Sequence, residues 1–411
     1  MLNRGAYMIE SKDKILSVLR LHSSNVYIND IYRIVLKNEK LNKKINIFDK
    51  VLFFLALIYW TTIFGLILII NIFKIKVIND FDEIGLARVA RTEVKVRRFN
   101  ENLQIITDDI VNRDFSIYQI GSRKQRLFFL LFRYIHLCVD DYKDVYKLIT
   151  KQELNHYSKA ILNNLVKRIP HTVVYKYSID KVVKKNKALV IYTGQMYDRF
   201  AIIEHQISTY YGKELVCIPH GVESTLEMPV GYIGNKFYCT SDHMCEKLKL
   251  LYQSNKFIYS SEVIERLFKS KSEKTNTNKN IVFFTQPVNR NKIIDTINII
   301  EKHFKPKGVE IYIKLHPADN IMHYKSCDIK VIEDFDDAIV NNICISSTST
   351  VLLESLYNES NAISIINLFE NNKALYGDYE FLNDPRIYKP NSINKLIKII
   401  DKKLKIQEEE K

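Results

Sequence analysis

The chain has few cysteines, and none is spaced for a metal site or a disulfide framework. Its 411 residues include six cysteines, without a Cys-x-x-Cys pair, and most lie in apolar runs. Zinc sites and disulfide frameworks need cysteines at short, paired spacings. We therefore expect reduced core cysteines in a cytoplasmic protein. The six are Cys138, Cys217, Cys239, Cys245, Cys327 and Cys344.

Other short signals are also missing. We identify no metal-binding motif and no Cys/His cluster, so we expect neither a metal nor another cofactor. The N-terminus is polar and charged, and the first apolar run begins too late for a cleavable signal peptide. Glycine and proline are scarce, at 11 and 8 residues, and we attach no function to that scarcity.

The chain is basic, but its charge does not indicate nucleic-acid binding. The formal net charge is +14, and residues 1–100 hold 17 basic against 9 acidic residues, a net of +8. No nucleic-acid-binding module accompanies this charge. Because the basic quarter surrounds an apolar segment, attraction to anionic lipid explains the charge better.

The longest apolar run, Val51–Phe73, contains no charged residue. As a helix it would measure about 34 Å, enough to cross a hydrocarbon core of about 30 Å. Lysines flank both ends, so the positive-inside rule assigns no orientation. We expect contact with a membrane, and the alternative is a wholly buried core helix.

The rest of the chain changes from a helical to an α/β pattern. Phe81–Gln152 is predicted to be mostly helical, and from Asn186 short apolar strands alternate with helices. Such alternation produces right-handed crossovers and parallel sheets. The predicted regions are a helical, basic region at 1–150 with a membrane segment at 51–73, an α/β domain at 151–269, a polar linker at 270–280 and a second α/β domain at 281–411.

Polar residues follow two apolar strands of the second α/β domain. One strand ends in Lys314–Pro317 (KLHP), and the other in Ser346–Ser349 (SSTS) directly before a predicted helix. Hydroxyls there lie beside unpaired N–H groups and the positive end of the helix dipole, which favour an anion, although they also suit a helix cap. The candidate phosphate-binding residues are Lys314, His316, Pro317, Ser346, Ser347, Thr348 and Ser349.

A candidate base follows a strand of the first α/β domain. The predicted strand Leu215–Ile218 ends in Pro219-His220-Gly221. An imidazole with an ordinary pKa of about 6.5 suits a general base near neutral pH, and a turn histidine without chemistry is the alternative. Asp198 and Glu204 are alternative bases. We expect Asp198 to cap its helix and Glu204 to lie on the polar flank of that helix.

The order of these motifs resembles a known group of bacterial enzymes. Lys314–Pro317 followed by Ser346–Ser349 is similar to the HP and SS/T motif pair of sialyltransferases and polysialyltransferases, and also to capsule Kdo transferases and CDP-glycerol glycerophosphotransferases. The resemblance covers residues 186–370. It implies the α/β GT-B architecture, in which two Rossmann-like domains face a cleft. It also implies that His316 and the hydroxyls of Ser346–Thr348 contact the phosphate of a CMP- or CDP-activated donor.

One motif departs from the sialyltransferase pattern. Those enzymes carry an acidic D/E-D/E-G motif that supplies the base, whereas Pro219-His220-Gly221 looks more like the His-Gly of the glycerophosphotransferases. The resemblance further implies that Glu354 binds the ribose hydroxyls. Gln286, at the end of another predicted strand, is a candidate contact for the base or phosphates of the nucleotide.

The residues and the resemblance together predict an inverting, metal-independent glycosyltransferase. We expect a nucleotide donor, with a CMP-activated sialic-acid-like sugar or Kdo favoured, and a lipid-linked glycan or a surface polysaccharide such as capsule or lipopolysaccharide as acceptor. Because such donors are cytoplasmic, we expect a peripheral protein at the cytoplasmic face of the inner membrane, anchored by a monotopic helix or a hairpin. Three alternatives remain: a CDP-glycerol-type polyol-phosphate transferase, a non-catalytic GT-B scaffold in capsule assembly, and a nucleotide-sugar epimerase.

Overall fold

The computed structural model describes residues 3–37, 44–78, 80, 82–151, 154–270, 279–286, 289–316, 319–369 and 380–409. These residues form two compact units. The first comprises Met1–His220, Glu227–Tyr238 and Lys249–Ile258, and the second comprises Gly221–Leu226, Cys239–Leu248 and Tyr259–Lys411.

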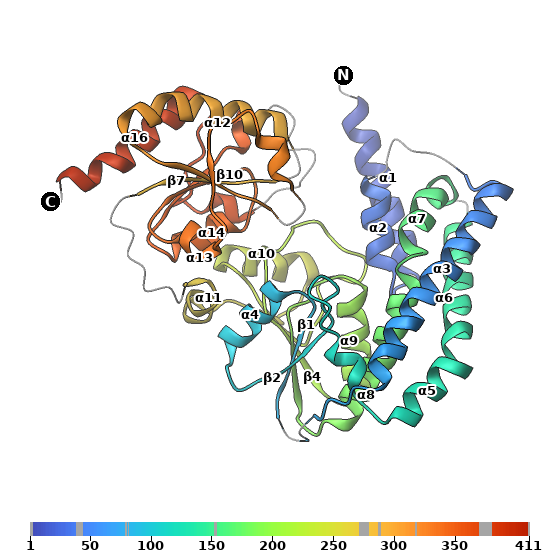
Figure 1. Cartoon of the computed structure of the whole chain (residues 1–411). Helices are drawn as coiled ribbons and strands as arrows, with labels where there is room; N and C mark the ends of the chain where they lie inside the picture. The colour runs from blue at the N-terminus through green and yellow to red at the C-terminus, as the bar shows by residue number, and fades with distance from the viewer. Residues whose placement is uncertain are drawn as a thin grey trace. The chain divides into compact units, whose positions relative to one another are not determined.

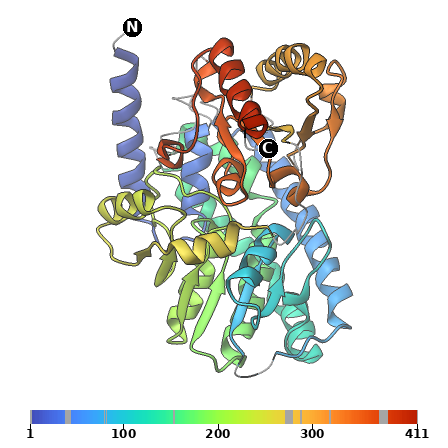
Figure 2. The ribbon, with the colours of Figure 1, turned by 90° about the vertical axis from the view of Figure 1, so that its left-hand side faces the viewer.

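Six parallel strands form the sheet of the first unit, in the order β2-β1-β3-β4-β5-β6. Figure 2 shows these strands as neighbouring arrows in the lower half of the view. Their residues are mostly buried in β1, β2 and β4, as expected where helices cover both faces of a parallel sheet. The strands are β1 (Ile84–Ala87), β2 (Gln104–Thr107), β3 (Val190–Thr193), β4 (Glu214–Cys217), β5 (Lys236–Tyr238) and β6 (Phe257–Ile258).

Helices at Ala90–Phe99, Arg123–Phe132 and Tyr134–Ile149 make Phe81–Gln152 mostly helical, as predicted, but the prediction missed strands β1 and β2. The first sheet therefore begins near residue 84 and not at the predicted domain boundary of 151. Each of these strands has only four residues, which is too short for an alternating pattern to stand out. Gly85 also makes β1 look unlike a strand. It is needed for close packing, because a Cβ there would lie 2.5 Å from Ile105 Cδ1 and 2.6 Å from Val96 Cγ1.

Helices surround this sheet, and the N-terminal helices form a further helical region beside it (Figure 1). The region Leu127–Leu148 is divided at Arg133 between two helices, α5 and α6. Helix α8 packs against both α9 and α3. The helices are α1 (Asn3–Arg20), α2 (Ile28–Lys37), α3 (Ile47–Ile72), α4 (Ala90–Phe99), α5 (Arg123–Phe132), α6 (Tyr134–Ile149), α7 (Ser158–Leu165), α8 (Ile169–Lys185), α9 (Arg199–Tyr210) and α10 (Asp242–Tyr252), of which α10 has residues in both units.

Helix α3 contains the long apolar run. Its N-terminus is closed by a capping box, in which Asn46 accepts from the Asp49 N–H at 2.7 Å and Asp49 accepts from the Asn46 N–H at 3.1 Å. Among the described helices, α3 alone is long and apolar enough to cross a membrane, yet only 28% of its most apolar window is buried. The alternative of a wholly buried core helix is therefore wrong.

Five parallel strands form the sheet of the second unit, in the order β11-β10-β7-β8-β9. The strands are β7 (Ile281–Phe284), β8 (Ile311–Lys314), β9 (Lys330–Val331), β10 (Ile343–Ser346) and β11 (Asn361–Ser364). The helices are α11 (Ser261–Phe268), α12 (Arg290–Phe304), α13 (Phe335–Ile339), α14 (Val351–Leu356) and α16 (Ile393–Glu409).

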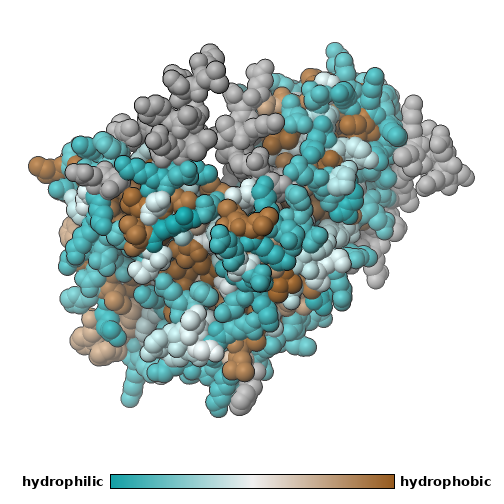
Figure 3. Space-filling model, turned by 180° about the vertical axis from the view of Figure 1, so that it is seen from behind, coloured by the Kyte–Doolittle hydropathy of each residue, from teal (hydrophilic) through white to brown (hydrophobic). Residues whose placement is uncertain are grey.

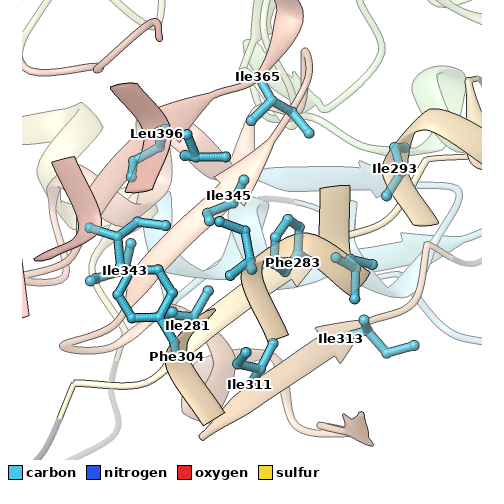
Figure 4. Packing of buried hydrophobic residues seen from close by; sticks show 14 of the residues in the cluster. Ile281, Phe283, Ile293, Phe304, Ile311, Ile313, Ile343, Ile345, Ile365 and Leu396 are labelled. Atoms are coloured by element: carbon cyan, nitrogen blue, oxygen red, sulfur yellow. The ribbon is translucent and has the colours of Figure 1, made fainter. Parts of the chain in front are cut away.

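Alternate residues of β7 enter two separate cores. Ile281 and Phe283 pack with residues of α12 and α16, including Phe304 and Leu396, as Figure 4 shows. Val282 and Phe284 pack on the other side, with residues of α13 and α14. This two-sided burial explains why the strand reads as a continuous apolar run in the sequence.

The predicted fold class is confirmed: the chain is α/β, with two Rossmann-like units and a helical N-terminal region. The six cysteines are free and buried, as predicted. Most of the predicted linker, 271–278, lies outside the described residues. The second unit nevertheless begins before this linker, because α11 packs onto it through a 2.9 Å hydrogen bond from Asn358 Nδ2 to the Phe268 carbonyl.

Candidate active site

In the second unit, Gln286 connects the loop after β7 with the hydroxyl run after β10. Its Oε1 accepts a hydrogen bond from the Ser347 hydroxyl and one of 3.2 Å from the Thr348 N–H. Its Nε2 donates to Thr348 Oγ1 at 3.2 Å. Because β7 and β10 are adjacent parallel strands, their carboxyl ends meet at one edge of the sheet. The structure thus brings Gln286, Ser347 and Thr348 together.

The other two hydroxyls of the run face different surroundings. Ser346 is 2% exposed and donates to the Phe284 carbonyl at 3.0 Å, inside the sheet. Ser349 accepts a 3.3 Å hydrogen bond from the Val351 N–H. The helix that follows, α14, has only six residues. The predicted helix is therefore present, but it is too short to contribute a strong dipole.

At the end of β8, His316 and Lys314 have different partners, and only Lys314 departs from the sequence expectation. His316 is exposed, and its N–H donates to Thr285 Oγ1 at 3.0 Å, which fixes the backbone of the turn beside β7. The Lys314 ammonium donates to the carbonyl of Glu333, which follows the edge strand β9. Lys314 is thus directed toward the edge strand and away from Ser347. Pro317 lies outside the described residues.

Glu354 is the most covered of the candidate nucleotide contacts. It lies in α14, and only 1% of the residue is exposed. A ribose hydroxyl would reach this carboxylate only if neighbouring side chains moved. A hollow of about 340 Å³ lies beside the same helix, between Tyr357 and Arg386, but none of the predicted site residues lines it.

In the first unit, His220 follows β4 and is held in one tautomer. Its Nδ1 is hydrogen-bonded to the Gly194 carbonyl. Since a carbonyl only accepts, Nδ1 must donate, and the lone pair of the neutral ring is on Nε2. Burial lowers the pKa of His220, opposed by the Gly194 carbonyl and by Asp198. The imidazole is therefore neutral at neutral pH.

Gly194 permits this contact because it packs tightly against α4. A Cβ at Gly194 would lie 2.0 Å from Thr92 Cγ2, so another residue would fit only if Thr92 moved. The same helix contributes two cations near the imidazole, and Arg91 and Lys95 both lower the pKa of His220.

A buried charged cluster adjoins this edge of the first sheet, and sequence reasoning missed it. Asp108 follows β2 and accepts hydrogen bonds from His171 Nε2 at 2.8 Å and from the Tyr118 hydroxyl at 2.7 Å. Arg88 follows β1, and its Nε lies 3.4 Å from the same carboxylate. Burial alone would raise the pKa of Asp108, but these partners outweigh it and hold the pKa below its usual range. The sequence signal was an apolar run ending in Thr107-Asp108-Asp109.

Asp198 connects this cluster with α9. One of its oxygens accepts from the N–H groups of Phe200 at 3.1 Å and Ala201 at 3.0 Å, which confirms the predicted helix cap. Its other oxygen lies 3.6 Å from Arg88 Nη1. The side chains of Arg88 and Asp198 are 19% and 24% exposed, so both remain accessible from solvent.

The expectation that Glu204 lies on the polar flank of its helix is wrong. Glu204 is fully buried and accepts a hydrogen bond from the Tyr175 hydroxyl. Burial raises the pKa of Glu204 to about 8. The helix faces the sheet at this position, so the carboxyl lies in the core. Because of its raised pKa, the carboxyl is protonated at neutral pH.

Within the described ranges, no three His, Cys, Asp or Glu side chains form a group that would hold an ion.

Several solved structures are distantly similar to this chain. A UDP-GlcNAc 2-epimerase from Methanocaldococcus jannaschii is 12% identical, covers 78% of this chain and 92% of its own, and has a TM-score of 0.44. The UDP-GlcNAc 2-epimerase of Neisseria meningitidis bound to UDP-GlcNAc is 11% identical, covers 80% of this chain and 94% of its own, and has a TM-score of 0.46. An E. coli heptosyltransferase with ADP is 8% identical, covers 78% of this chain and 99% of its own, and has a TM-score of 0.37. Because every one of these TM-scores is below 0.5, the likenesses bear on neither substrate nor reaction.

Comparisons by sequence find no relative. No protein-family model matches the chain, and no curated protein matches it.

Proposed function

We propose that the chain is an inverting, metal-independent GT-B glycosyltransferase that uses a nucleotide-activated sugar. The observation that carries this proposal is the state of His220, a neutral imidazole whose Nδ1 is tied to the Gly194 carbonyl. It lies after a strand of a Rossmann-like sheet, at the edge where such sheets bind ligands.

In this reaction, Nε2 of His220 accepts the proton of an acceptor hydroxyl as its oxygen attacks the anomeric carbon. The new carbon–oxygen bond forms while the bond from that carbon to the donor phosphate breaks. The electron pair leaves with the nucleotide phosphate. Asp198 is the alternative base, since its side chain is partly exposed, whereas protonated and covered Glu204 is disfavoured.

The proposed donor site lies in the second unit. His316 is exposed, and its backbone is fixed by Thr285, which suits an imidazole that contacts a phosphate oxygen. Gln286 orients Ser347 and Thr348, so these three residues offer an ordered set of hydroxyl and amide groups beside it. We assign weaker roles in donor binding to Ser349, Lys314, Pro317 and Glu354. Buried Ser346 supports the loop.

We further propose a CMP-activated acidic sugar as donor and a surface polysaccharide or lipid-linked glycan as acceptor, at the cytoplasmic face of the membrane. The motif order after β8 and β10 supports the CMP donor. The histidine in place of an acidic base favours a second candidate, transfer of a polyol phosphate from a CDP-linked compound.

A donor panel tests these proposals. The purified chain is incubated with CMP-, CDP- and UDP-linked donors, and release of each nucleotide is measured. We expect CMP release from a CMP-sugar. Release of CMP from CDP-glycerol alone would instead establish the polyol-phosphate candidate, and a chain that neither binds nor cleaves any of the donors would be a scaffold.

A further inference from the structure

One face of helix α3 is packed firmly into the first unit. Phe64 stacks on His171 of α8, with ring centroids 4.7 Å apart. Gly65 lies against Tyr134 of α6, where a Cβ would be 3.6 Å from Cε1. The Tyr134 hydroxyl donates to the Thr61 carbonyl at 3.0 Å. The middle of α3 is therefore attached to two other helices.

The C-terminal end of α3 is attached as well, through a buried arginine. Arg126 of α5 is 1% exposed and donates to the carbonyls of Asn71 at 3.1 Å and Ile72 at 2.9 Å, in the last turn of α3. It also donates to the Tyr118 carbonyl at 2.9 Å. A helix held in this way cannot turn across a bilayer without separating from its own domain.

The opposite face of α3 is apolar and exposed, and α5 continues it. The representative residues of this face are between 47% and 62% exposed. On the side facing away from Figure 1, Figure 3 shows hydrophobic residues in separate patches among hydrophilic ones. We name this surface, formed by α3 and α5, the apolar platform. Its representative side chains are Phe54, Leu55, Ile58, Phe128, Leu131 and Phe132.

The exposed charges on the two platform helices and their immediate flanks are of one sign. Within residues 47–75 and 123–135 the only acidic residue is Asp49, which is buried and lies 2.6 Å from Lys159. The exposed charged residues of these two segments are all basic: Lys50, Lys74, Arg123, Lys124 and Arg133. A basic rim around an apolar face matches the headgroups and acyl chains of an anionic lipid surface.

We propose that α3 lies in the plane of an anionic membrane surface, with the apolar platform immersed in one leaflet and both helix ends on the same side. This in-plane arrangement replaces the hairpin and spanning alternatives. A second copy of the chain is a poorer partner for the apolar platform, because the basic rims of the two copies would repel each other. The proposal is independent of the reaction that the chain catalyses.

Vesicle flotation of the full chain tests the partner. We expect binding to vesicles with one third phosphatidylglycerol and weaker binding to pure phosphatidylcholine. Combining Phe128→Ser, Leu131→Gln and Phe132→Ser should lower partitioning on the order of 100-fold. The matched control combines Leu189→Gln, Tyr210→Ser and Leu250→Gln, which lie outside the platform, are even more exposed than the three platform residues, and should leave binding unchanged.

The basic rim is tested separately. Lys74→Gln with Lys124→Gln should lower binding to the anionic vesicles by about fivefold for each lysine and leave binding to neutral vesicles unchanged. Lys184→Gln with Lys185→Gln, at the exposed end of α8, is the charge-matched control. An equal loss in the two double variants would overturn the role of the rim.

Labelling with an impermeant thiol reagent tests the in-plane geometry. The native cysteines are buried, so Lys44→Cys and Lys74→Cys report on the two ends of α3 with little background. We expect both to react when the protein is added outside sealed vesicles. Protection of one end would show a spanning helix. If the chain instead forms a soluble dimer that does not bind vesicles, and if the platform substitutions dissociate this dimer, a second copy covers the surface. Either result overturns the proposal.

Discussion

His220 Nδ1 donates a hydrogen bond to the Gly194 carbonyl, which leaves the basic lone pair of the imidazole on Nε2. The residues involved follow two adjacent strands, β3 and β4. The hydrogen bond therefore depends on the sheet itself and not on a flexible loop. For the base that we propose, a tautomer fixed by the backbone means that the imidazole is prepared for proton transfer before the substrate binds.

The pH dependence of kcat/KM should report the lowered pKa of His220. Because the ordinary value is 6.5 and burial with Arg91 and Lys95 lowers it, activity should be constant through neutral pH and fall only on the acid side of 6.5. Arg91→Gln removes one of these cations and should shift the acid limb to higher pH. Arg97→Gln, on the same helix but paired with Glu93, is the control. An acid limb that moves equally in both variants would contradict this assignment.

His316→Ala should weaken donor binding, because we assign its exposed imidazole to the donor phosphate. We expect a roughly tenfold rise in the Kd for the nucleotide, equivalent to one charge-assisted hydrogen bond. Titration calorimetry measures it, and His323→Ala, a neighbouring exposed histidine, is the control. Unchanged affinity for every nucleotide tested would remove His316 from the donor site.

Glu204→Gln should change how stability depends on pH. The carboxyl has a pKa of about 8 in the folded state and about 4.3 when unfolded. A raised pKa contributes stability that is fully present below about pH 4.3 and is lost as the pH rises through 8. The variant lacks this loss. Its free energy of unfolding should therefore exceed that of the native chain by a difference that grows from zero near pH 4.3 to about 3 kcal/mol at pH 7.

Urea denaturation at several pH values measures this difference. Glu262→Gln, an exposed carboxylate at the start of α11, should show no such trend. A Glu204→Gln variant that is destabilised at pH 7 would show that the buried carboxyl is charged and paired, contrary to our assignment.

Arg126→Met should destabilise the first unit by about 3 kcal/mol, since it removes the donor for three carbonyls at 3.1 Å or less. Arg123→Met is the matched control, because Arg123 is exposed and makes a single 3.3 Å hydrogen bond, to the Phe73 carbonyl. The urea midpoint measures both variants. Equal midpoints would mean that Arg126 does not hold α3 to α5.

Sequence reasoning located strands where the chain is buried on both sides. The strand before Gln286, β7, was predicted, because its alternate residues enter two cores and leave no polar position. It failed at β1, where a glycine required for close packing interrupts a four-residue strand. Arg88, which follows β1, was missed for that reason, and Asp108 was missed because β2 also has only four residues. Residues at strand ends are recognised only once the strands are.

The apolar segment shows a second limit of the sequence. Both faces of α3 are apolar, so no periodicity reveals which face packs inward. The packed face is fixed by partners distant in the chain, such as Arg126 and His171. At the donor site, the strand-end rule grouped Ser347 with its neighbours. It did not reveal that Gln286 orients the hydroxyl, or that Lys314 pairs with the Glu333 carbonyl.

The central claim is that His220 is the base of a sugar transfer from a nucleotide donor. The most direct test measures CMP release and CMP-sugar affinity for the native chain and for His220→Ala. We predict that the variant binds the donor with unchanged affinity and loses turnover by 10²- to 10⁴-fold. Turnover that survives His220→Ala, or donor affinity that falls as steeply as turnover, would contradict the account.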